Sequence, residues 1–279
     1  MNLTSPSEVK GLLARLECSP RRSAGQNFLI DRNIRDIVLR AANVQKGEEV
    51  LEIGPGLGVL TEELLEQADR VYAVEIDRAL HAHLYNCFAE NERMVLIHAD
   101  AMDVDLKGFF RSGVSRFVSN LPYSVGSRIL YGLAGPQDAP QSMTVMLQRD
   151  VADRITAPVG NKQYGLLTIW LNMFYKPSVV KHVNATCFYP RPQVGSSVVQ
   201  LDLRDEPLYP VLDWGEFEKM VKYCFTQRRK QLGTILRGGV CVRSEEQIVA
   251  AGLMPEMRPE EVDVSAWGRL ADIEPEARA

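Results

Sequence analysis

The sequence has no long apolar run, few histidines and no paired cysteine motif. No stretch of about 18 or more consecutive apolar residues occurs in the 279 residues, so a membrane-spanning helix is not expected. The five cysteines are odd in number and none forms a Cys-x-x-Cys pair, which is typical of a reducing compartment without a disulfide framework. His81 and His83 share a predicted helix at a spacing where side chains point apart. We therefore expect no metal site and no membrane partner.

The composition is that of an ordinary globular protein, with 46% hydrophobic and 24% charged residues. The length suits one large domain and a small one. Residues 1–22 lack the apolar core and the small-residue cleavage site of a secretory signal, so we expect a cytoplasmic protein. No internal repeat or low-complexity tract interrupts the chain.

The net charge of −4 disfavours a nucleic-acid partner, but the charge is unevenly distributed. Residues 1–40 carry +3 and residues 141–240 carry +5, whereas residues 41–140 carry −7 and residues 241–279 carry −5. Phosphate binding depends on local basic surface rather than on the total charge. The two basic segments therefore leave a nucleic-acid partner open, although a solvated surface of mixed charge explains the same pattern equally well.

Short apolar runs alternate with helical patterns through the first part of the chain. We expect strands at residues 49–53, 70–74, 94–98, 116–119 and 142–148, and helices at residues 59–67, 78–89, 125–133 and from 149 to about 156. Strands that alternate with helices are typical of parallel strands joined by crossovers. The sequence therefore predicts an α/β fold with a doubly wound, mostly parallel sheet.

The pattern changes after this region. Residues 179–184 and 196–203 are strand-like and are joined without a helix, which predicts an antiparallel pair at the sheet edge. Beyond the break at residues 205–207 the segments are helical, beginning with a helix over residues 214–225. We therefore predict a large domain over residues 1–205, which starts with the basic segment 1–40, and a small helical domain over residues 206–279.

A glycine-rich loop follows the first expected strand. Glu52, Gly54, Gly56 and Gly58 form a Glu-x-Gly-x-Gly-x-Gly string at a junction between strand and helix. Glycine allows the sharp turn and lets a ligand approach the backbone closely. Doubly wound folds bind nucleotides at such turns, at the carboxyl ends of their strands.

Carboxylates stand at the ends of the next two strands. Glu75 is placed to accept hydrogen bonds from a ribose diol, and Asp100 suits an adenine amine. Asp77 is an alternative ribose ligand, but the strand register favours Glu75. A nicotinamide dinucleotide and S-adenosylmethionine both fit this pattern, and the Gly-x-Gly-x-Gly spacing disfavours the dinucleotide. A glycine-rich turn without a ligand is the remaining interpretation, which the two strand-end carboxylates disfavour.

The tetrapeptide Asn120-Leu121-Pro122-Tyr123 ends the fourth expected strand. The N6 amine of adenine is a poor nucleophile because its lone pair is conjugated with the ring. Two acceptors that hold its hydrogens, the Asn120 side-chain oxygen and the Leu121 carbonyl, would expose this lone pair. Pro122 restricts the backbone on both sides of that carbonyl. Tyr123 offers a ring on which a base can stack.

Eight short stretches together resemble one family, the bacterial small-subunit rRNA adenine N6,N6-dimethyltransferases, which are relatives of the eukaryotic dimethyladenosine transferases. These stretches are residues 25–29 (GQNFL), 52–58 (EIGPGLG), 74–77 (VEID), 100–102 (DAM), 120–123 (NLPY), 146–148 (MLQ), 188–192 (FYPRP) and 227–230 (QRRK). They span about residues 25 to 240, and together they are far more specific than the glycine loop alone.

The resemblance implies roles for individual residues. The residues that it places at S-adenosylmethionine are Asn27, Leu29, Gly54, Gly56, Glu75, Ile76, Asp100, Ala101 and Asn120. It implies that Asn120, Leu121, Pro122 and Tyr123 form the catalytic loop, with Phe188 stacked on the target base opposite Tyr123. An isolated Phe188 beside prolines would more often be a packing residue. Arg228, Arg229 and Lys230 would usually be a solvated helix face, but together with Lys222 and Arg237 they favour contact with the RNA backbone.

The resemblance further implies the reaction and the partner. A class I S-adenosylmethionine-dependent methyltransferase would dimethylate N6 of adenosines, two adjacent ones, in a loop near the 3′ end of 16S rRNA. The substrate would be an immature small ribosomal subunit and the enzyme a monomer. The target base would leave its stack to enter the pocket.

Three alternatives stay open. The first is a related enzyme that methylates a large-subunit rRNA adenosine, although the sequence at residues 188–192 and the length of the C-terminal part favour the small-subunit class. The second is a DNA adenine methyltransferase, whose tetrapeptide usually has proline where Leu121 stands. The third is a non-catalytic assembly or transcription factor, which the intact Glu75, Asp100 and tetrapeptide disfavour.

Overall fold

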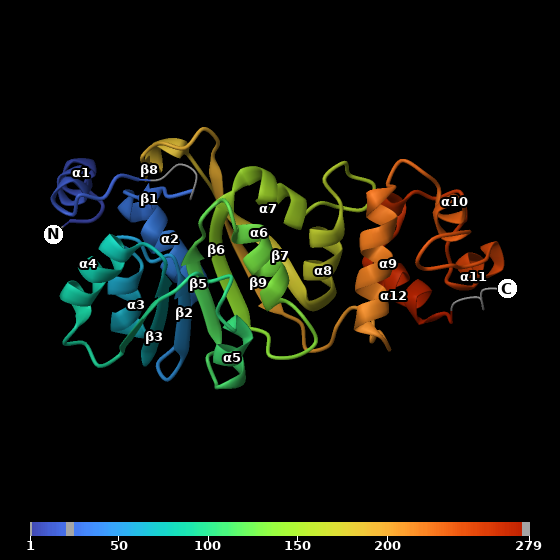
Figure 1. The fold of residues 1–279 in the computed structure, drawn as a ribbon, viewed down its shortest axis with the longest axis horizontal. Coiled ribbons are helices and arrows are strands. Elements are labelled where there is room, and N and C mark those ends of the chain that lie inside the picture. The colour runs from blue at the N-terminus through green and yellow to red at the C-terminus, as the bar shows by residue number, and fades with distance from the viewer. Residues whose placement is uncertain (1, 21–24, 275–279) are drawn as a thin grey trace. The chain divides into compact units, whose positions relative to one another are not determined.

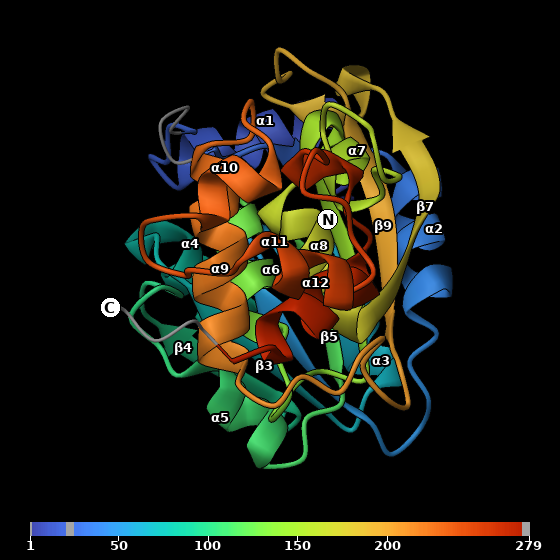
Figure 2. The ribbon, with the colours of Figure 1, turned by 90° about the vertical axis from the view of Figure 1, so that its right-hand side faces the viewer.

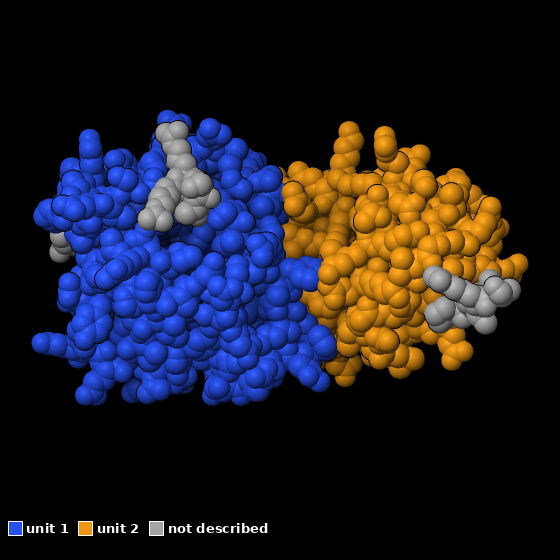
Figure 3. All heavy atoms as spheres, viewed as in Figure 1, with its two compact units in different colours: residues 1–152, 177–203 blue, residues 153–176, 204–279 orange. Residues whose placement is uncertain are grey.

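The computed structural model describes residues 2–20 and 25–274. They form two compact units, coloured separately in Figure 3: residues 1–152 with 177–203, and residues 153–176 with 204–279. The chain leaves the first unit after Leu203, close to the predicted boundary after Asp205, but residues 153–176 also lie in the second unit. The functions predicted for the two domains stay predictions.

A seven-stranded sheet in the order β4-β3-β2-β5-β6-β9-β7 dominates the first unit (Figure 1). Its strands are β2 (Glu49–Ile53), β3 (Arg70–Glu75), β4 (Met94–His98), β5 (Arg116–Asn120), β6 (Ser142–Gln148), β7 (Tyr175–Val183) and β9 (Ser196–Leu203). The pairs β2–β3, β2–β5, β3–β4 and β5–β6 are parallel, and β6–β9 is antiparallel. The predicted doubly wound, mostly parallel sheet is confirmed.

Helices cover both faces of this sheet. They are α2 (Arg32–Ala42), α3 (Thr61–Gln67), α4 (Arg78–Phe88), α5 (Leu106–Arg111), α6 (Gly126–Leu133) and α7 (Arg149–Ile155), the last of which continues into the second unit. The first helix, α1 (Pro6–Arg15), packs instead with Phe28 and Leu57 in a separate buried cluster. The apolar sides of α2 and α3 pack with Val71 and Val118 in one buried cluster. Tyr72 points to the opposite face, as successive strand residues do, and its ring contacts Phe109 of α5.

Two short strands join distant parts of the first unit. β1 (Phe28–Leu29) pairs antiparallel with β8 (Phe188–Tyr189), so that Leu29 stands opposite Phe188. The Ile30 N–H extends this pairing by donating to the Cys187 carbonyl at 2.8 Å. The sequence did not predict this small sheet, which fixes the segment around Asn27 beside the large sheet.

The second unit is helical, which confirms the predicted helical C-terminal region. Its helices include α8 (Leu166–Phe174), α9 (Trp214–Thr226), α10 (Leu232–Leu236), α11 (Glu245–Ala250) and α12 (Val264–Asp272). α9 and α12 lie side by side, as Figure 2 shows. The rings of Trp170, Phe174, Trp214 and Phe217 pack against one another in its core.

Among the described residues, the longest helices fall short of the length and apolarity that crossing a membrane requires. The same residues contain no cluster of three or more histidine, cysteine, aspartate or glutamate side chains that would hold a metal ion.

Candidate active site

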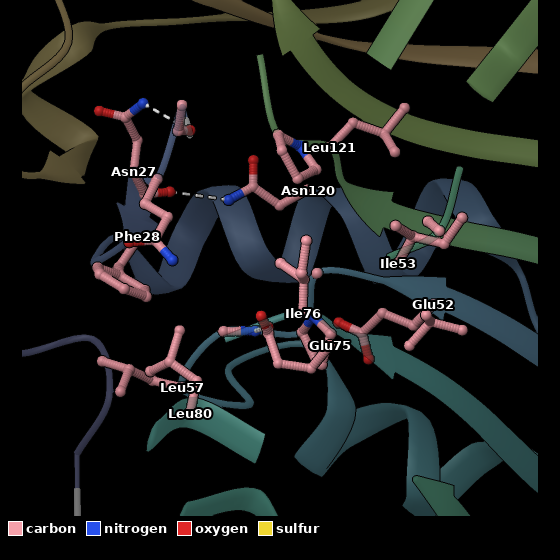
Figure 4. A pocket seen from close by; sticks show the side chains of 18 of the residues that line it. Asn27, Phe28, Glu52, Ile53, Leu57, Glu75, Ile76, Leu80, Asn120 and Leu121 are labelled. Carbon is pink, nitrogen blue, oxygen red and sulfur yellow. Dashed lines mark hydrogen bonds between the residues drawn. The ribbon is translucent and has the colours of Figure 1, made fainter. Parts of the chain in front are cut away.

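A cavity of about 280 Å³ opens at the carboxyl ends of β2, β3 and β5 in the first unit. Its walls bring together twelve of the predicted site residues: Asn27, Leu29, Gly54, Gly56, Glu75, Ile76, Asp100, Ala101, Asn120, Leu121, Pro122 and Tyr123. Figure 4 shows several of them converging from separate elements. The strand ends predicted from the sequence therefore meet in one cavity, as the parallel sheet requires.

The glycine loop lies against the catalytic tetrapeptide. Gly54 has φ +66, and a Cβ at this position would lie 3.2 Å from the Pro122 ring. Its N–H donates to the Val74 carbonyl at 2.9 Å, which ties the loop to β3. A side chain at residue 54 would thus be strained and crowded at once, so the loop needs glycine to reach the tetrapeptide.

The Glu75 carboxylate is buried at the end of β3. Its two oxygens accept hydrogen bonds from the Gly56 N–H at 3.1 Å and from the Asp77 N–H at 2.8 Å. Burial raises the pKa of Glu75, and these backbone donors oppose the rise. The Asp77 side chain instead caps α4 by accepting from the N–H groups of Ala79 and Leu80, and it does not line the cavity. This placement supports the choice of Glu75 over Asp77.

A second buried carboxylate, Glu52, lines the cavity and was not predicted as a ligand. It pairs with Ala73 in the β2–β3 register, so it points to the same face of the sheet as Glu75. Its Oε2 accepts from the Thr61 hydroxyl at 2.7 Å. Burial raises its pKa to about 8, the Thr61 hydrogen bond opposes this, and the nearby Glu75 charge adds to it. The sequence did contain a sign of this role, because a glutamate inside an otherwise apolar strand is unusual.

Asn120 ends β5 with a fixed side-chain amide. Its Nδ2 donates to the Asn27 carbonyl at 3.1 Å, as drawn in Figure 4, so its Oδ1 is the atom left as an acceptor. Neither this Oδ1 nor the Leu121 carbonyl accepts a hydrogen bond from any residue that the structure describes. Leu121 itself is held by its N–H, which donates to the Met146 carbonyl at 3.0 Å.

The Asn27 segment is positioned by Gly25. This glycine has φ +68, and a Cβ there would lie 2.7 Å from the Tyr123 backbone nitrogen. Any other residue would push the segment away from the tetrapeptide and displace the carbonyl that holds Asn120. The glycine at residue 25 therefore has a steric reason that its sequence context alone did not reveal.

Tyr123 and Ile76 offer surfaces to ligands at the cavity. The Tyr123 hydroxyl hydrogen-bonds the Ser196 hydroxyl at 2.5 Å, and burial raises its pKa, so the phenol stays neutral at physiological pH. The Ile76 side chain is 57% exposed although it is large and apolar. Such an exposed apolar group at a cavity wall suits the face of an aromatic ligand.

Phe188, expected to stack on the target base opposite Tyr123, does not line this cavity. Its side chain is 2% exposed and packs in the core cluster with Leu29 and Val183. It is absent from the cavity lining. The pairing of β8 with β1 places it opposite Leu29 in the core. The predicted stacking of Phe188 on the target base stays a prediction.

The predicted RNA-binding cluster lies in the turn after α9 rather than on a helix face. Arg228 is committed to the fold, because its guanidinium donates to the Lys162 carbonyl at 2.9 Å and lies 3.5 Å from the Glu260 carboxylate. Arg229 and Lys230 are exposed. The Lys230 ammonium donates to the Gln227 side chain at 2.9 Å.

Comparison with known proteins agrees with this geometry. A family model described as ribosomal RNA adenine dimethylase matches residues 18–273. The chain belongs to this family. A relative from Opitutus terrae, named ribosomal RNA small subunit methyltransferase A, is 38% identical over 95% of this chain and 97% of its own length. A relative of the same name from Clostridium botulinum (strain Loch Maree / Type A3) is 35% identical over the same shares.

Solved structures of similar proteins share the fold. A dimethyladenosine transferase from Plasmodium falciparum is 25% identical with a TM-score of 0.75, over 87% of this chain and 95% of that chain. The 23S rRNA methyltransferase ErmE is 27% identical with a TM-score of 0.67, over 88% and 98%. As a member of the rRNA adenine dimethylase family, the chain is an S-adenosylmethionine-dependent rRNA adenine dimethyltransferase.

Proposed function

We propose that this dimethyltransferase acts on two adjacent adenosines in a loop near the 3′ end of small-subunit rRNA and dimethylates N6 of each. The substrate is an immature small ribosomal subunit in the cytoplasm, and the enzyme acts as a monomer. The relatives named as small-subunit methyltransferases are 35–38% identical, whereas ErmE is 27% identical, which favours the small subunit. The observation that carries the chemistry is a pair of acceptors in one cavity, Asn120 Oδ1 and the Leu121 carbonyl, to which no described residue donates a hydrogen bond.

The residues present fit S-adenosylmethionine. Two buried carboxylates, Glu52 and Glu75, suit a ligand that carries both positive charge and a ribose diol. Glu75 would hold the ribose diol, Asp100 the adenine amine, and Ile76 would lie against the adenine ring. The backbone of Gly54 and Gly56 would lie close to the remaining part of the cofactor. Asn27, Leu29 and Ala101 would complete this set. When bound, S-adenosylmethionine supplies a methyl group activated by its sulfonium charge.

The tetrapeptide would prepare the target amine. Asn120 Oδ1 and the Leu121 carbonyl would accept the two N6 hydrogens, which draws the nitrogen toward tetrahedral geometry and exposes its lone pair. Pro122 holds the Leu121 carbonyl in one direction, and Tyr123 would stack on the base. A general base is not needed during the attack, because the methylated ammonium product is strongly acidic. Catalysis is then mainly orientation and exclusion of water.

Replacing Glu75 by alanine is expected to weaken cofactor binding roughly tenfold or more, since hydrogen bonds to a charged group contribute about 1.5–3 kcal/mol. Calorimetric titration of the folded variant with S-adenosylmethionine measures this. Asp77→Ala is the matched control, because its carboxylate caps α4 and does not line the cavity. An unchanged Kd for the Glu75 variant would overturn the ribose assignment.

The second unit is proposed to hold the rRNA backbone through the turn after α9. Because Arg228 is tied to Glu260 and to the Lys162 carbonyl, a variant without it would perturb the fold, and the clean test uses Arg229 and Lys230. The double alanine variant should bind immature subunits more weakly, and the slope of log K against log salt should fall by about 0.7–0.9 for each phosphate that is no longer bound. Cofactor affinity should not change. Wild-type slope and affinity would show that these side chains are merely solvated.

Label uptake separates the proposed substrate from its rivals. The protein is incubated with labelled S-adenosylmethionine and, separately, immature small subunits, large subunits or duplex DNA. Labelled dimethyladenosine in small-subunit rRNA alone supports the proposal. Label in the large subunit or in DNA would overturn the substrate assignment.

A further inference from the structure

A hollow of about 430 Å³ in the first unit lies beside the catalytic loop, outside the cofactor cavity. Its walls are Arg149, His182, Val183, Asn184, Ala185, Arg191, Gly195 and Ser196. Neither the cofactor nor the target base, as placed above, accounts for these residues.

The polar groups of this hollow are suited to an anion. Arg149 and Arg191 are exposed, and neither guanidinium forms an ion pair with any residue in the described ranges. No aspartate or glutamate is among the lining residues. The Oδ1 of Asn184 already accepts from the Thr186 N–H at 3.0 Å, which leaves its NH₂ as a donor. The hollow thus presents donors and two uncompensated positive charges.

Both walls of the hollow are hydrogen-bonded to the catalytic loop. Ser196 begins β9, and its hydroxyl bonds the Tyr123 hydroxyl at 2.5 Å. Arg149 directly follows β6, whose Met146 carbonyl accepts from the Leu121 N–H at 3.0 Å. The Arg149 N–H donates to the Gly195 carbonyl at 3.0 Å and so joins the two walls. The backbone that carries Arg149 and the Gly195–Ser196 wall of the hollow are therefore tied to the residues that receive the base.

We propose that this hollow binds a backbone phosphate of the rRNA strand next to the target adenosine. The inference rests on the proposed function, because it assumes that the base beside Tyr123 belongs to RNA. A strand whose base enters the pocket must continue past Tyr123, where Arg149 and Arg191 offer forked donors that match phosphate oxygens. Phosphate contacts fix the position of a nucleic acid without reading its sequence. Arg149 and Arg191 are positioning residues that hold the strand while the tetrapeptide acts.

The test compares Arg149→Gln, Arg191→Gln and their double variant with Arg40→Gln. Arg40 is an exposed arginine at the end of α2 that forms no ion pair with a described residue and lies outside the hollow, so it controls for the removal of one positive charge. Binding to immature small subunits is measured across a salt series, with calorimetric cofactor titration and melting temperatures on the same proteins. Methyl transfer is measured at saturating subunits.

The single variants should bind subunits more weakly, and the slope of log K against log salt should fall by about 0.7–0.9, the value for one bound phosphate. The double variant should lower the transfer rate at saturation, because an unfixed strand presents its base less often in the reactive position. Cofactor Kd and melting temperature should match wild type. Slopes and rates equal to those of Arg40→Gln would overturn the phosphate site, even where wild type methylates small-subunit rRNA. Absence of methylation by wild type would instead overturn the proposed function.

Discussion

Replacing Asn120 by alanine should lower the rate of methyl transfer by about 100-fold or more, the usual effect of removing one preorganised group that stabilises a transition state. The Asn120 amide is fixed before any substrate arrives, because its Nδ2 donates to the Asn27 carbonyl at 3.1 Å. Its Oδ1 is therefore already positioned to hold one N6 hydrogen. Alanine removes that acceptor, and the Leu121 carbonyl alone cannot expose the lone pair.

The measurement separates chemistry from binding. Single-turnover methyl transfer at saturating cofactor is compared with filter binding of immature small subunits, on wild type and on the variant. RNA affinity should be largely kept, because the backbone contacts lie elsewhere. An equal fall in affinity and rate would mean that Asn120 serves the structure of the loop rather than the reaction.

The strand ends were predictable from the sequence because they obey local rules. Short apolar runs located β2, β3 and β4, and in a parallel sheet their carboxyl ends share one edge. The predicted helix over residues 78–89 matches α4 (Arg78–Phe88), which the Asp77 side chain caps. Glu75 and Asp100 could therefore be placed in one cavity before their contacts were known.

What the sequence could not show depends on contacts between distant segments. Leu29 and Phe188 pair across most of the first unit, and no local pattern announces a two-residue strand. That pairing buries Phe188, whose prediction as a stacking residue rested on the family resemblance. Arg228 is similar, because its partners Glu260 and Lys162 are remote in the chain. The basic residues 228–230 therefore comprise one residue that stabilises the fold, Arg228, and two exposed residues, Arg229 and Lys230.

Glu52 belongs to the glycine-rich string that the sequence shows, but the sequence did not predict it as a ligand. Its position inside an apolar strand predicts burial. Only the structure shows that, among the described residues, the Thr61 hydroxyl is the one donor to its carboxylate, and that Glu52 lies on the same face of the sheet as Glu75. A buried acid with so little compensation takes up a proton. Its pKa of about 8 makes Glu52 largely neutral at pH 7 while the site holds no cation.

Binding of the cationic cofactor should therefore depend on pH through Glu52. A positive ligand favours the ionised carboxylate, so binding below pH 8 must release the proton. We expect the Kd of wild type to fall about tenfold from pH 6 to 7 and about fivefold from pH 7 to 8, with release of about one proton at pH 7. Titrations in two buffers of different ionisation enthalpy measure both quantities.

Glu52→Gln is the matched variant, because its amide keeps the shape and can still accept from the Thr61 hydroxyl. Its Kd should be higher than that of wild type at pH 8 and nearly independent of pH, without proton release.

The stability of the protein without cofactor gives a second test of the Glu52 pKa. Since the folded pKa of Glu52 exceeds its ordinary value of 4.5, wild type without cofactor loses stability as pH rises from that value to about 8. The variant should therefore melt higher than wild type at pH 8 and nearly equally at pH 5. A wild-type Kd that does not change with pH, together with equal melting at pH 8, would show that Glu52 is already ionised and is not the counter-charge to the cofactor.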